Sequence, residues 1–205
     1  KTNFNYIKKC NVDSSIEIAK WATKRNIHFI YISGAIVYRN ENRKNLEKSK
    51  ILNYSNNAYR NSKILCERKI YTYKKRGLSL TIFRPSSIYG WGLNQKKIVC
   101  KILNLSMKKK EIIIHDVKKT NVNLIHALDV SNAVLKAVKK KVKGIFNLGS
   151  SNLSNFYEIA KLSNKLCKNK KKIKIIEKKD ILSINKLDVN IKNTKKKLGW
   201  SPQIS

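Results

Sequence analysis

A tyrosine and a lysine placed four residues apart could carry acid–base chemistry in this chain. Tyr59 and Lys63 stand in a segment whose pattern predicts a helix from about residue 57 to residue 76. Residues four apart lie on one face of a helix, one turn above the other. A lysine cation beside a phenol favours the phenolate and lowers the tyrosine pKa from its usual value of about 10. Such a pair can act as a general acid and base for hydride chemistry at neutral pH.

The spacing alone is weak evidence, because lysine is so common here. The chain has nine tyrosines and 46 Lys and Arg residues, so about two Tyr-x-x-x-Lys matches are expected by chance. It contains three, and the other two are Tyr71/Lys75 and Tyr157/Lys161. For any single pair, an exposed tyrosine above a solvated lysine is the simpler interpretation. The surrounding sequence is therefore needed to decide which of the three Tyr-x-x-x-Lys pairs is functional.

Two continuous apolar runs flank the predicted helix. Residues 27–33 form one run and residues 78–83 the other, and both are rich in β-branched side chains. Such runs are typical of buried strands in a parallel sheet, so the three elements predict a β-α-β unit. Ligands bind at the carboxyl ends of strands in open α/β sheets. We therefore expect Ser33 and residues 84–87 to lie at that edge.

Seven segments, in one order along nearly the whole chain, match the motifs of a known family. Each match alone is weak, whereas their common order is specific. The segments are Asn11-Val12, Tyr31–Tyr38, Ala58–Lys63 with Glu67, Phe83–Gly90, Leu124–Val130, Phe146–Ser150 and Leu198–Pro202. Together they resemble the extended short-chain dehydrogenase/reductase family, the NAD-dependent nucleotide-sugar epimerases and dehydratases. The resemblance selects Tyr59/Lys63 over the other two pairs.

The resemblance implies an α/β fold. It consists of an incomplete Rossmann-like parallel sheet with flanking helices and a small α/β substrate-binding portion. Residues 1–90 would be the C-terminal half of an NAD-binding Rossmann domain, to whose sheet strand 144–149 returns. Residues 91–143 and 150–205 would form the substrate-binding portion.

The resemblance also implies roles for individual residues, with NAD or NADP as the cofactor. Tyr59 would exchange a proton with a sugar hydroxyl, and Lys63 would lower its pKa and bind the nicotinamide ribose. Pro85 would approach the nicotinamide through its backbone, and Ser87 would contact the nucleotide-sugar phosphate. Ser33 is the candidate for the hydroxyl that steadies the reacting oxygen beside the cofactor. No metal ion is expected.

Three positions depart from the family pattern. Gly34 stands where the family has a catalytic Ser or Thr, so Ser33 can replace that hydroxyl only if the strand end shifts by one residue. An equally supported alternative is that the Ser33 hydroxyl is satisfied by backbone. Ser87 replaces a frequent Asn, and Val122-Asn123 replaces a frequent Arg-Asp whose Arg pairs with the substrate diphosphate.

Helical periodicity predicts further elements around this site. A helix over 11–25 is expected to open at Asn11, and a helix over 155–167 is expected to carry Tyr157/Lys161 facing outward. Asp129 is interpreted as the N-cap of a helix over 130–141.

The family's Gly-x-x-Gly-x-x-Gly phosphate loop has no counterpart among the seven glycines. The sequence begins where the fourth helix of the family would. We therefore expect a fragment, a decayed gene or a piece completed by a separate chain. An unpaired sheet edge and weak NAD affinity would then impair the activity.

The net charge of +34 favours polyanion binding as an alternative. In that interpretation the chain is a catalytically degenerate family member that binds RNA or a protein partner. Lysine, however, far outnumbers arginine, the usual choice for bidentate phosphate contacts. The Lys, Ile and Asn content also resembles a codon bias towards A and T. We therefore favour a compositional origin of the charge, with non-specific polyanion binding at low salt.

The sequence also suggests a compartment and partners. No run of about 18 apolar residues is present, and residues 1–9 show no secretory signal, so neither a membrane partner nor secretion is expected. The four cysteines show no Cys-x-x-Cys spacing, which favours the reducing cytoplasm over a disulfide framework or a metal site. A nucleotide sugar is the expected substrate, and the helix from Tyr59 to Arg76 is the expected homodimer contact.

Overall fold

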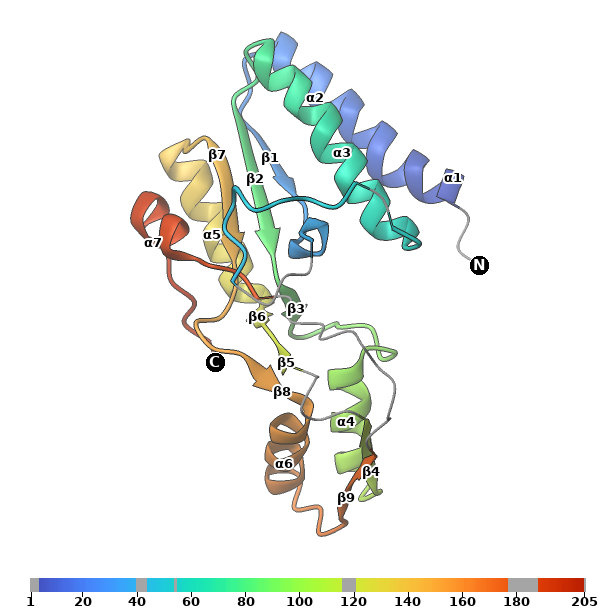
Figure 1. Cartoon of the computed structure of the whole chain (residues 1–205). Helices are drawn as coiled ribbons and strands as arrows, with labels where there is room; N and C mark the ends of the chain where they lie inside the picture. Colours follow the sequence, from blue (N-terminus) through green and yellow to red (C-terminus); the bar gives the residue numbers. More distant parts are fainter. Residues whose placement is uncertain (1–3, 40–43, 54, 116–120, 177–187, 205) are drawn as a thin grey trace.

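The computed structural model describes residues 4–39, 44–53, 55–115, 121–176 and 188–204 (Figure 1). In these ranges the larger sheet has the parallel order β1-β2-β7. Its strands are β1 (Phe29–Ile32), β2 (Leu80–Pro85) and β7 (Gly144–Leu148). Every residue of β2 is buried, as its continuous apolar run predicts for a central strand. The predicted α/β class with a parallel sheet is confirmed.

One face of this sheet is covered by the N-terminal helices. They are α1 (Phe4–Lys8), the π-helical segment η1 (Lys9–Asp13), α2 (Ser14–Lys24) and α3 (Ala58–Lys75). Successive strand residues point to opposite faces, so alternate residues meet these helices. Tyr31, Leu80 and Ile82 pack there with Ala19 and Ile70.

The opposite face is covered by helices from the C-terminal half. Phe83 and Phe146 pack against α5 (Ala127–Lys140) and α7 (Lys192–Leu198). Trp200 is 1 % exposed and its indole donates a hydrogen bond to the Asp129 carbonyl at 2.9 Å. The division at residue 90 therefore stays a proposal with one amendment. Both α5 and α7, which lie within the ranges expected to form the substrate-binding portion, pack on the larger sheet.

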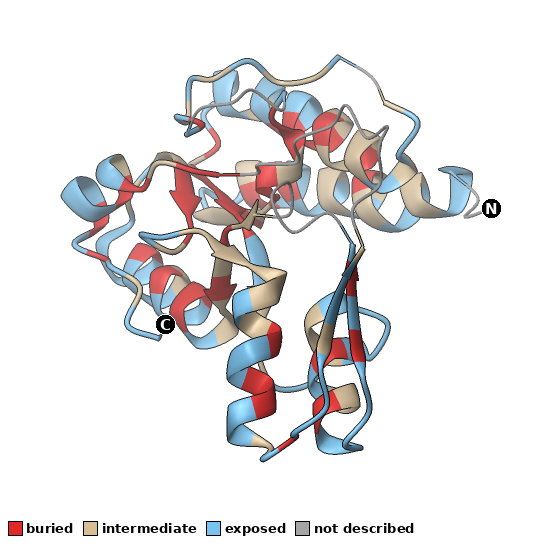
Figure 2. Cartoon of the chain, turned by 60° about the horizontal axis from the view of Figure 1, so that its bottom comes forward, coloured by how far each residue is buried: buried red, intermediate tan, exposed pale blue. Residues whose placement is uncertain are grey.

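A smaller unit lies below the larger sheet in Figure 1. Its helices α4 (Ile98–Met107) and α6 (Phe156–Leu166) lie against the parallel strands β4 (Ile112–His115) and β9 (Ile173–Ile176). The helices carry buried residues on one side and exposed residues on the other (Figure 2). A capping box at Asn155 and Glu158 starts α6.

Two short strand pairs connect the larger and smaller units. The parallel pair joins β3 (Ser87–Tyr89) to β6 (Leu124–His126). The antiparallel pair joins β5 (Asn121–Val122) to β8 (Ser154–Asn155).

Three local predictions are wrong. Helical structure begins at Phe4, so Asn11 does not open a helix and lies inside the π-helical segment, with its side chain directed at Ser62. The N-cap of α5 is His126, whose Nδ1 accepts from Leu128 N at 3.2 Å, whereas the Asp129 carboxylate is buried and accepts from backbone beyond Trp200. Tyr157 is not directed outward, because it packs against the small core around Ile102.

Candidate functional site

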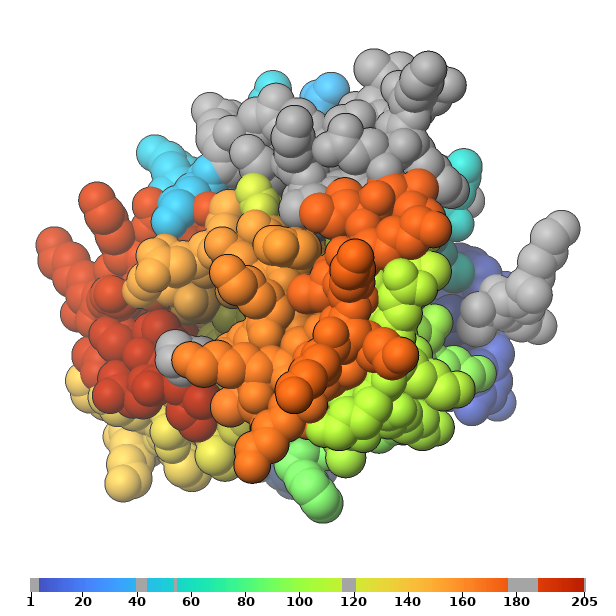
Figure 3. All heavy atoms as spheres, turned by 90° about the horizontal axis from the view of Figure 1, so that it is seen from below, coloured from blue at the N-terminus to red at the C-terminus, as the bar shows by residue number. Residues whose placement is uncertain are grey.

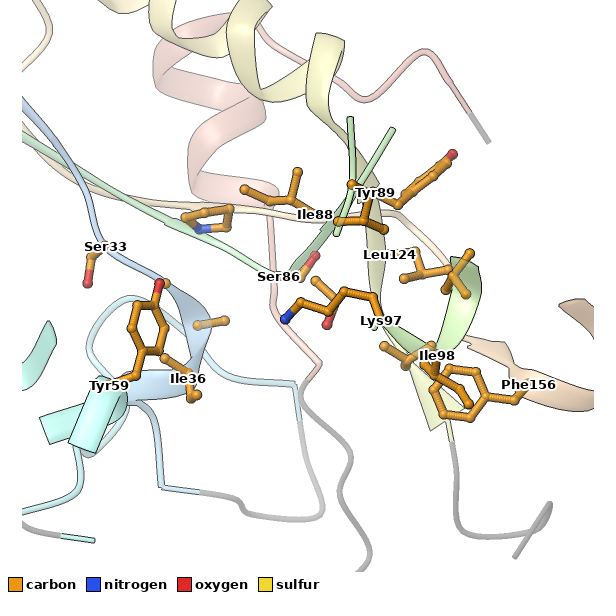
Figure 4. Close-up of a pocket in the computed structure, with 17 residues that line it drawn as sticks. Ser33, Ile36, Tyr59, Ser86, Ile88, Tyr89, Lys97, Ile98, Leu124 and Phe156 are labelled. Atoms are coloured by element: carbon orange, nitrogen blue, oxygen red, sulfur yellow. The ribbon is translucent and has the colours of Figure 1, made fainter. Parts of the chain in front are cut away.

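A pocket of about 500 Å³ opens where β1 and β2 end, between the larger sheet and α4 (Figure 4). Its walls come from both strand ends, the first turn of α3, β3, α4 and α6. It therefore lies where strand ends in α/β sheets bind ligands. It is lined by Ser33, Gly34, Ala35, Ile36, Tyr59, Pro85, Ser86, Ser87, Ile88, Tyr89, Leu93, Lys97, Ile98, Val99, Val122, Leu124 and Phe156.

Tyr59 reaches the pocket from the first turn of α3. Asn57 caps this helix, because its side chain accepts from Arg60 N at 3.0 Å. The Asn11 amide donates to Ser62 Oγ at 3.2 Å, and Ser62 Oγ donates to the Tyr59 carbonyl at 2.7 Å. Two different helices thus fix the turn that carries Tyr59, whose side chain is 47 % exposed.

Lys63 lies beneath Tyr59 and is directed at the end of β1. Its ammonium donates to the Ile32 carbonyl at 2.9 Å and lies 5.7 Å from the Tyr59 ring centroid. It also lies 5.1 Å from the ring of Tyr31. Burial lowers the pKa of Lys63. The residue therefore holds a cation in a largely dry position next to the tyrosine.

The predicted effect of Lys63 on Tyr59 is not found. Partial burial raises the pKa of Tyr59, and no lowering contribution from Lys63 accompanies it. The ammonium faces a carbonyl and the tyrosine ring, and these positions do not direct it at the phenol oxygen. Tyr59 and Lys63 therefore lie close together as predicted, but the pKa of Tyr59 is not lowered.

Ser33 is 4 % exposed and lies at the same end of the pocket as Tyr59 in the view of Figure 4. Its backbone N–H donates to the Phe83 carbonyl at 2.8 Å, which continues the ladder past β1. Its hydroxyl has no hydrogen-bond partner among the described residues. The alternative that backbone satisfies this hydroxyl is therefore wrong. A buried hydroxyl that lines a pocket without a partner is available to a ligand.

Gly34 follows with an extended backbone, at φ −177° and ψ 150°. Any residue adopts this conformation. A Cβ at this position would meet Ile36 Cγ2 at 3.5 Å and the Pro85 carbonyl oxygen at 4.0 Å, which are ordinary contacts. Neither backbone nor space requires glycine here.

The end of β2 forms the floor of the pocket, and Asn123 fixes it. Ser86 donates through its hydroxyl to Asn123 Oδ1 at 2.8 Å, and Ser87 donates through its backbone to the Asn123 carbonyl at 3.1 Å. The Asn123 amide donates to the Ser150 carbonyl and to Asp188 Oδ1. Asn123 is therefore structural, whereas Pro85 and the exposed Ser87 line the pocket.

Lys97 also lines the pocket and had not been predicted. It is the residue before α4, and its ammonium is directed into the pocket in Figure 4. Among the described lining residues, Lys97 alone carries a charge. Nothing in the sequence separates it from Lys96 or from the many other lysines, so only its position in space identifies it.

A buried ion pair supports the floor from below. Arg84 Nε donates to Glu67 Oε1 at 3.0 Å, and Arg84 Nη1 donates to Tyr38 Oη at 3.1 Å. Tyr38 in turn donates to Asn147 Oδ1 at 2.6 Å. The network joins α3, β2 and β7 directly behind the pocket.

Two observations concern metal binding and membrane spanning. In the ranges that the structure describes, no three His, Cys, Asp or Glu residues come together to hold a metal ion. None of the helices within these ranges has the length and apolar character needed to cross a bilayer.

The fold and the site define a member of a known enzyme family. The family model for the NAD dependent epimerase/dehydratase family matches residues 1–149. The chain therefore belongs to this family.

Its curated relatives are dehydratases. The dTDP-D-glucose 4,6-dehydratase of Bos taurus is 28 % identical over 135 residues, and that of Dictyostelium discoideum is 29 % identical over 142. These alignments cover 65 % and 66 % of this chain, but only 38 % and 32 % of the relatives. The chain thus matches less than half the length of these relatives.

Solved structures show the same fold. The UDP-glucose 4-epimerase of Thermotoga maritima superposes with a TM-score of 0.82 at 22 % identity, over 97 % of this chain and 66 % of the other. The dTDP-glucose 4,6-dehydratase of Bacillus anthracis, solved in complex with NAD, superposes with a TM-score of 0.83 at 18 % identity, over 97 % and 64 %. At these identities the likeness concerns the fold.

Proposed function

We propose that the chain carries the catalytic part of an NAD-dependent epimerase or dehydratase that acts on a nucleotide sugar. One observation carries this proposal. Tyr59, above the half-buried Lys63 cation, shares one pocket with the unpartnered Ser33 hydroxyl at the carboxyl ends of two parallel strands. The family and the dehydratase relatives support the same reaction class.

The residues present fit the nicotinamide end of the cofactor, NAD or NADP. Ser33 offers a buried donor and Lys63 a half-buried donor next to Tyr59, and Pro85 brings backbone to the same edge. When bound, the cofactor accepts and returns a hydride. No glycine-rich loop for its pyrophosphate occurs in these 205 residues, which supports weak cofactor binding by this chain alone.

Each residue then has a defined task. Tyr59 exchanges a proton with a sugar hydroxyl, and Lys63 binds the nicotinamide ribose. Ser33 donates its free hydroxyl to the reacting sugar oxygen. Ser87 and Lys97 bind the diphosphate of the nucleotide sugar, and Lys97 supplies positive charge on a side of the site where the family's frequent Arg is replaced by Val122.

Substitution of Lys97 tests the substrate side. We expect Lys97→Gln to weaken binding of UDP-glucose and dTDP-glucose about tenfold, because a charge-assisted contact to the diphosphate is lost. The neighbouring Lys96→Gln, which removes the same charge outside the pocket lining, should change affinity less than twofold. Isothermal titration calorimetry on the 205-residue chain measures both. Equal affinities for the two variants would contradict the role of Lys97.

Calorimetry with NAD tests the proposed function itself. Saturable binding that Lys63→Met weakens and Lys75→Met leaves intact is the expected result. A folded chain that binds neither NAD nor a nucleotide sugar would instead favour the alternative, a degenerate member that binds RNA or a protein partner. The glycine at position 34 is the feature that favours this alternative.

Location and assembly are part of the same proposal. All four cysteines are free thiols, in keeping with a cytoplasmic location. We propose that two copies associate through α3, whose outer surface exposes Tyr71.

A further inference from the structure

Two lysine-rich turns lie side by side at the far end of the smaller unit. Lys108–Lys110 follow α4, and Lys168–Lys172 follow α6. The strands that leave these turns pair in parallel from Ile112 and Ile173 onward, so the turns meet at one tip (Figure 1). Figure 3 views this end directly and shows the two segments, orange and yellow-green, forming one face. We call Lys108–Lys110 and Lys168–Lys172 together the lysine tip.

Buried asparagines hold the two turns together. Asn169 is 7 % exposed and its amide donates to the Lys110 carbonyl at 2.9 Å and to Asn164 Oδ1 at 2.9 Å. The Asn164 amide donates to the Lys171 carbonyl at 3.2 Å. The backbone of the lysine tip is therefore fixed from inside, while its lysine side chains remain exposed.

The lysine tip concentrates positive charge, with Glu111 as the one negative charge in the hollow between the turns. None of its lysines forms an ion pair among the described residues, and Glu111 is the one carboxylate in the two turns. A shallow hollow of about 660 Å³ lies between the turns and is lined by four lysines, one carboxylate and one leucine: Lys109, Lys110, Lys171, Lys172, Glu111 and Leu105. One or two lysines suffice to complement a helix C-terminus, so the helix dipole does not account for this convergence. Its chemistry suits a phosphate-bearing surface.

Exposed aliphatic side chains border the same tip. Met107, in the last turn of α4, is 62 % exposed, and Leu166, in the last turn of α6, is 72 % exposed. The tip contains neither arginine nor an aromatic residue, which RNA recognition ordinarily uses for bidentate contacts and base stacking. Lysines combined with protruding aliphatic groups are typical of peripheral membrane contacts.

We propose that the lysine tip attaches the protein to an anionic phospholipid surface. Headgroup phosphates lie against the lysines of the hollow, and Met107 and Leu166 enter the interface. The expectation of no membrane partner rested on the lack of a spanning segment, which peripheral attachment does not require. The inference is independent of the proposed enzymatic function, because no residue of the tip lines the candidate active site.

Vesicle co-sedimentation of the 205-residue chain tests this proposal. We expect binding to phosphatidylcholine vesicles that contain phosphatidylserine and little binding to phosphatidylcholine alone. Replacing the four lysines of the hollow by Glu should lower partitioning by at least roughly 600-fold, since each lysine near an anionic surface contributes about a factor of five and each new carboxylate is repelled by it. The variant Met107→Ser/Leu166→Ser should bind at low salt and lose the salt-resistant fraction that the wild type keeps.

The matched control reverses the same number of charges elsewhere. Lys139, Lys140, Lys195 and Lys196, all exposed on α5 and α7 away from the tip, are replaced by Glu. An equal loss of vesicle binding in this control would mean that net charge alone acts, which overturns the proposal. Displacement of the vesicles by inorganic phosphate, or tighter binding of a poly(U) RNA through the same lysines, would also overturn it in favour of a small-anion or nucleic-acid site.

Discussion

Replacing Glu67 by Gln is expected to destabilise the protein by about 3–5 kcal/mol, because it leaves a buried guanidinium without its counter-charge. Arg84 is 1 % exposed and Glu67 is 5 % exposed, and the two groups are joined by paired hydrogen bonds. Burial alone lowers the pKa of Arg84, but the hydrogen bonds and charge of Glu67 reverse this and raise it. Glutamine keeps the size of the side chain but removes the charge and one of the two oxygens that accept from Arg84, so a loss of packing cannot explain the result.

Urea unfolding followed by circular dichroism measures this free energy. Glu17→Gln, at an exposed position in the first turn of α2, is the matched control and should stay within about 0.5 kcal/mol of the wild type. The double variant Glu67→Gln/Arg84→Met should recover much of the loss, because it removes the stranded charge as well. A Glu67→Gln variant as stable as the control would show that the pair adds nothing to the fold.

Replacing Tyr59 by Phe is expected to lower turnover of the nucleotide sugar by about 10²–10⁴-fold, the usual contribution of a general acid or base. Binding of the sugar should change little, because the ring and its contacts with the pocket remain. Tyr71→Phe is the matched control, since Tyr71 lies on the same helix, belongs to a second Tyr-x-x-x-Lys match and is 42 % exposed away from the pocket. The assay follows product formation with NAD present.

The pH dependence of turnover is a second test of the role of Tyr59. Partial burial raises the pKa of Tyr59, so its ionised form is populated only at a higher pH than in a free tyrosine. The rate of the step that needs Tyr59 as a base should therefore rise with pH into the alkaline range. Full turnover by Tyr59→Phe, or a rate that falls through this range while the chain stays folded, would remove Tyr59 from the mechanism.

The sequence predicted the sheet and the helix that carries Tyr59 because each depends on local signals. Buried parallel strands require continuous apolar runs, so residues 27–33 and 78–83 identified β1 and β2. The start of α3 was also predicted, at about residue 57. The side chain of Asn57 accepts a hydrogen bond from a free N–H group of the first turn, as an N-cap residue does. With both strand ends located, Ser33 and residues 84–87 were expected at that edge, whereas Tyr59 was selected by the family resemblance.

The misplaced features depend on contacts between distant parts of the chain. Asp129 has the residue type of an N-cap, but backbone N–H groups some 75 positions later take its carboxylate, and His126 caps the helix instead. Lys97 became visible only when α4 was placed beside the strand ends. Whether the Ser33 hydroxyl has a hydrogen-bond partner depends on all the residues that surround it in space, and a local sequence pattern cannot predict these.

The space around Gly34 has a consequence for how this position could evolve. Because the backbone is extended and a Cβ would make only ordinary contacts, a serine could occupy the position without rearrangement. One base change converts a GGT or GGC glycine codon into a serine codon. From such a codon a single mutation would place a hydroxyl at position 34, and the local backbone and space would receive it.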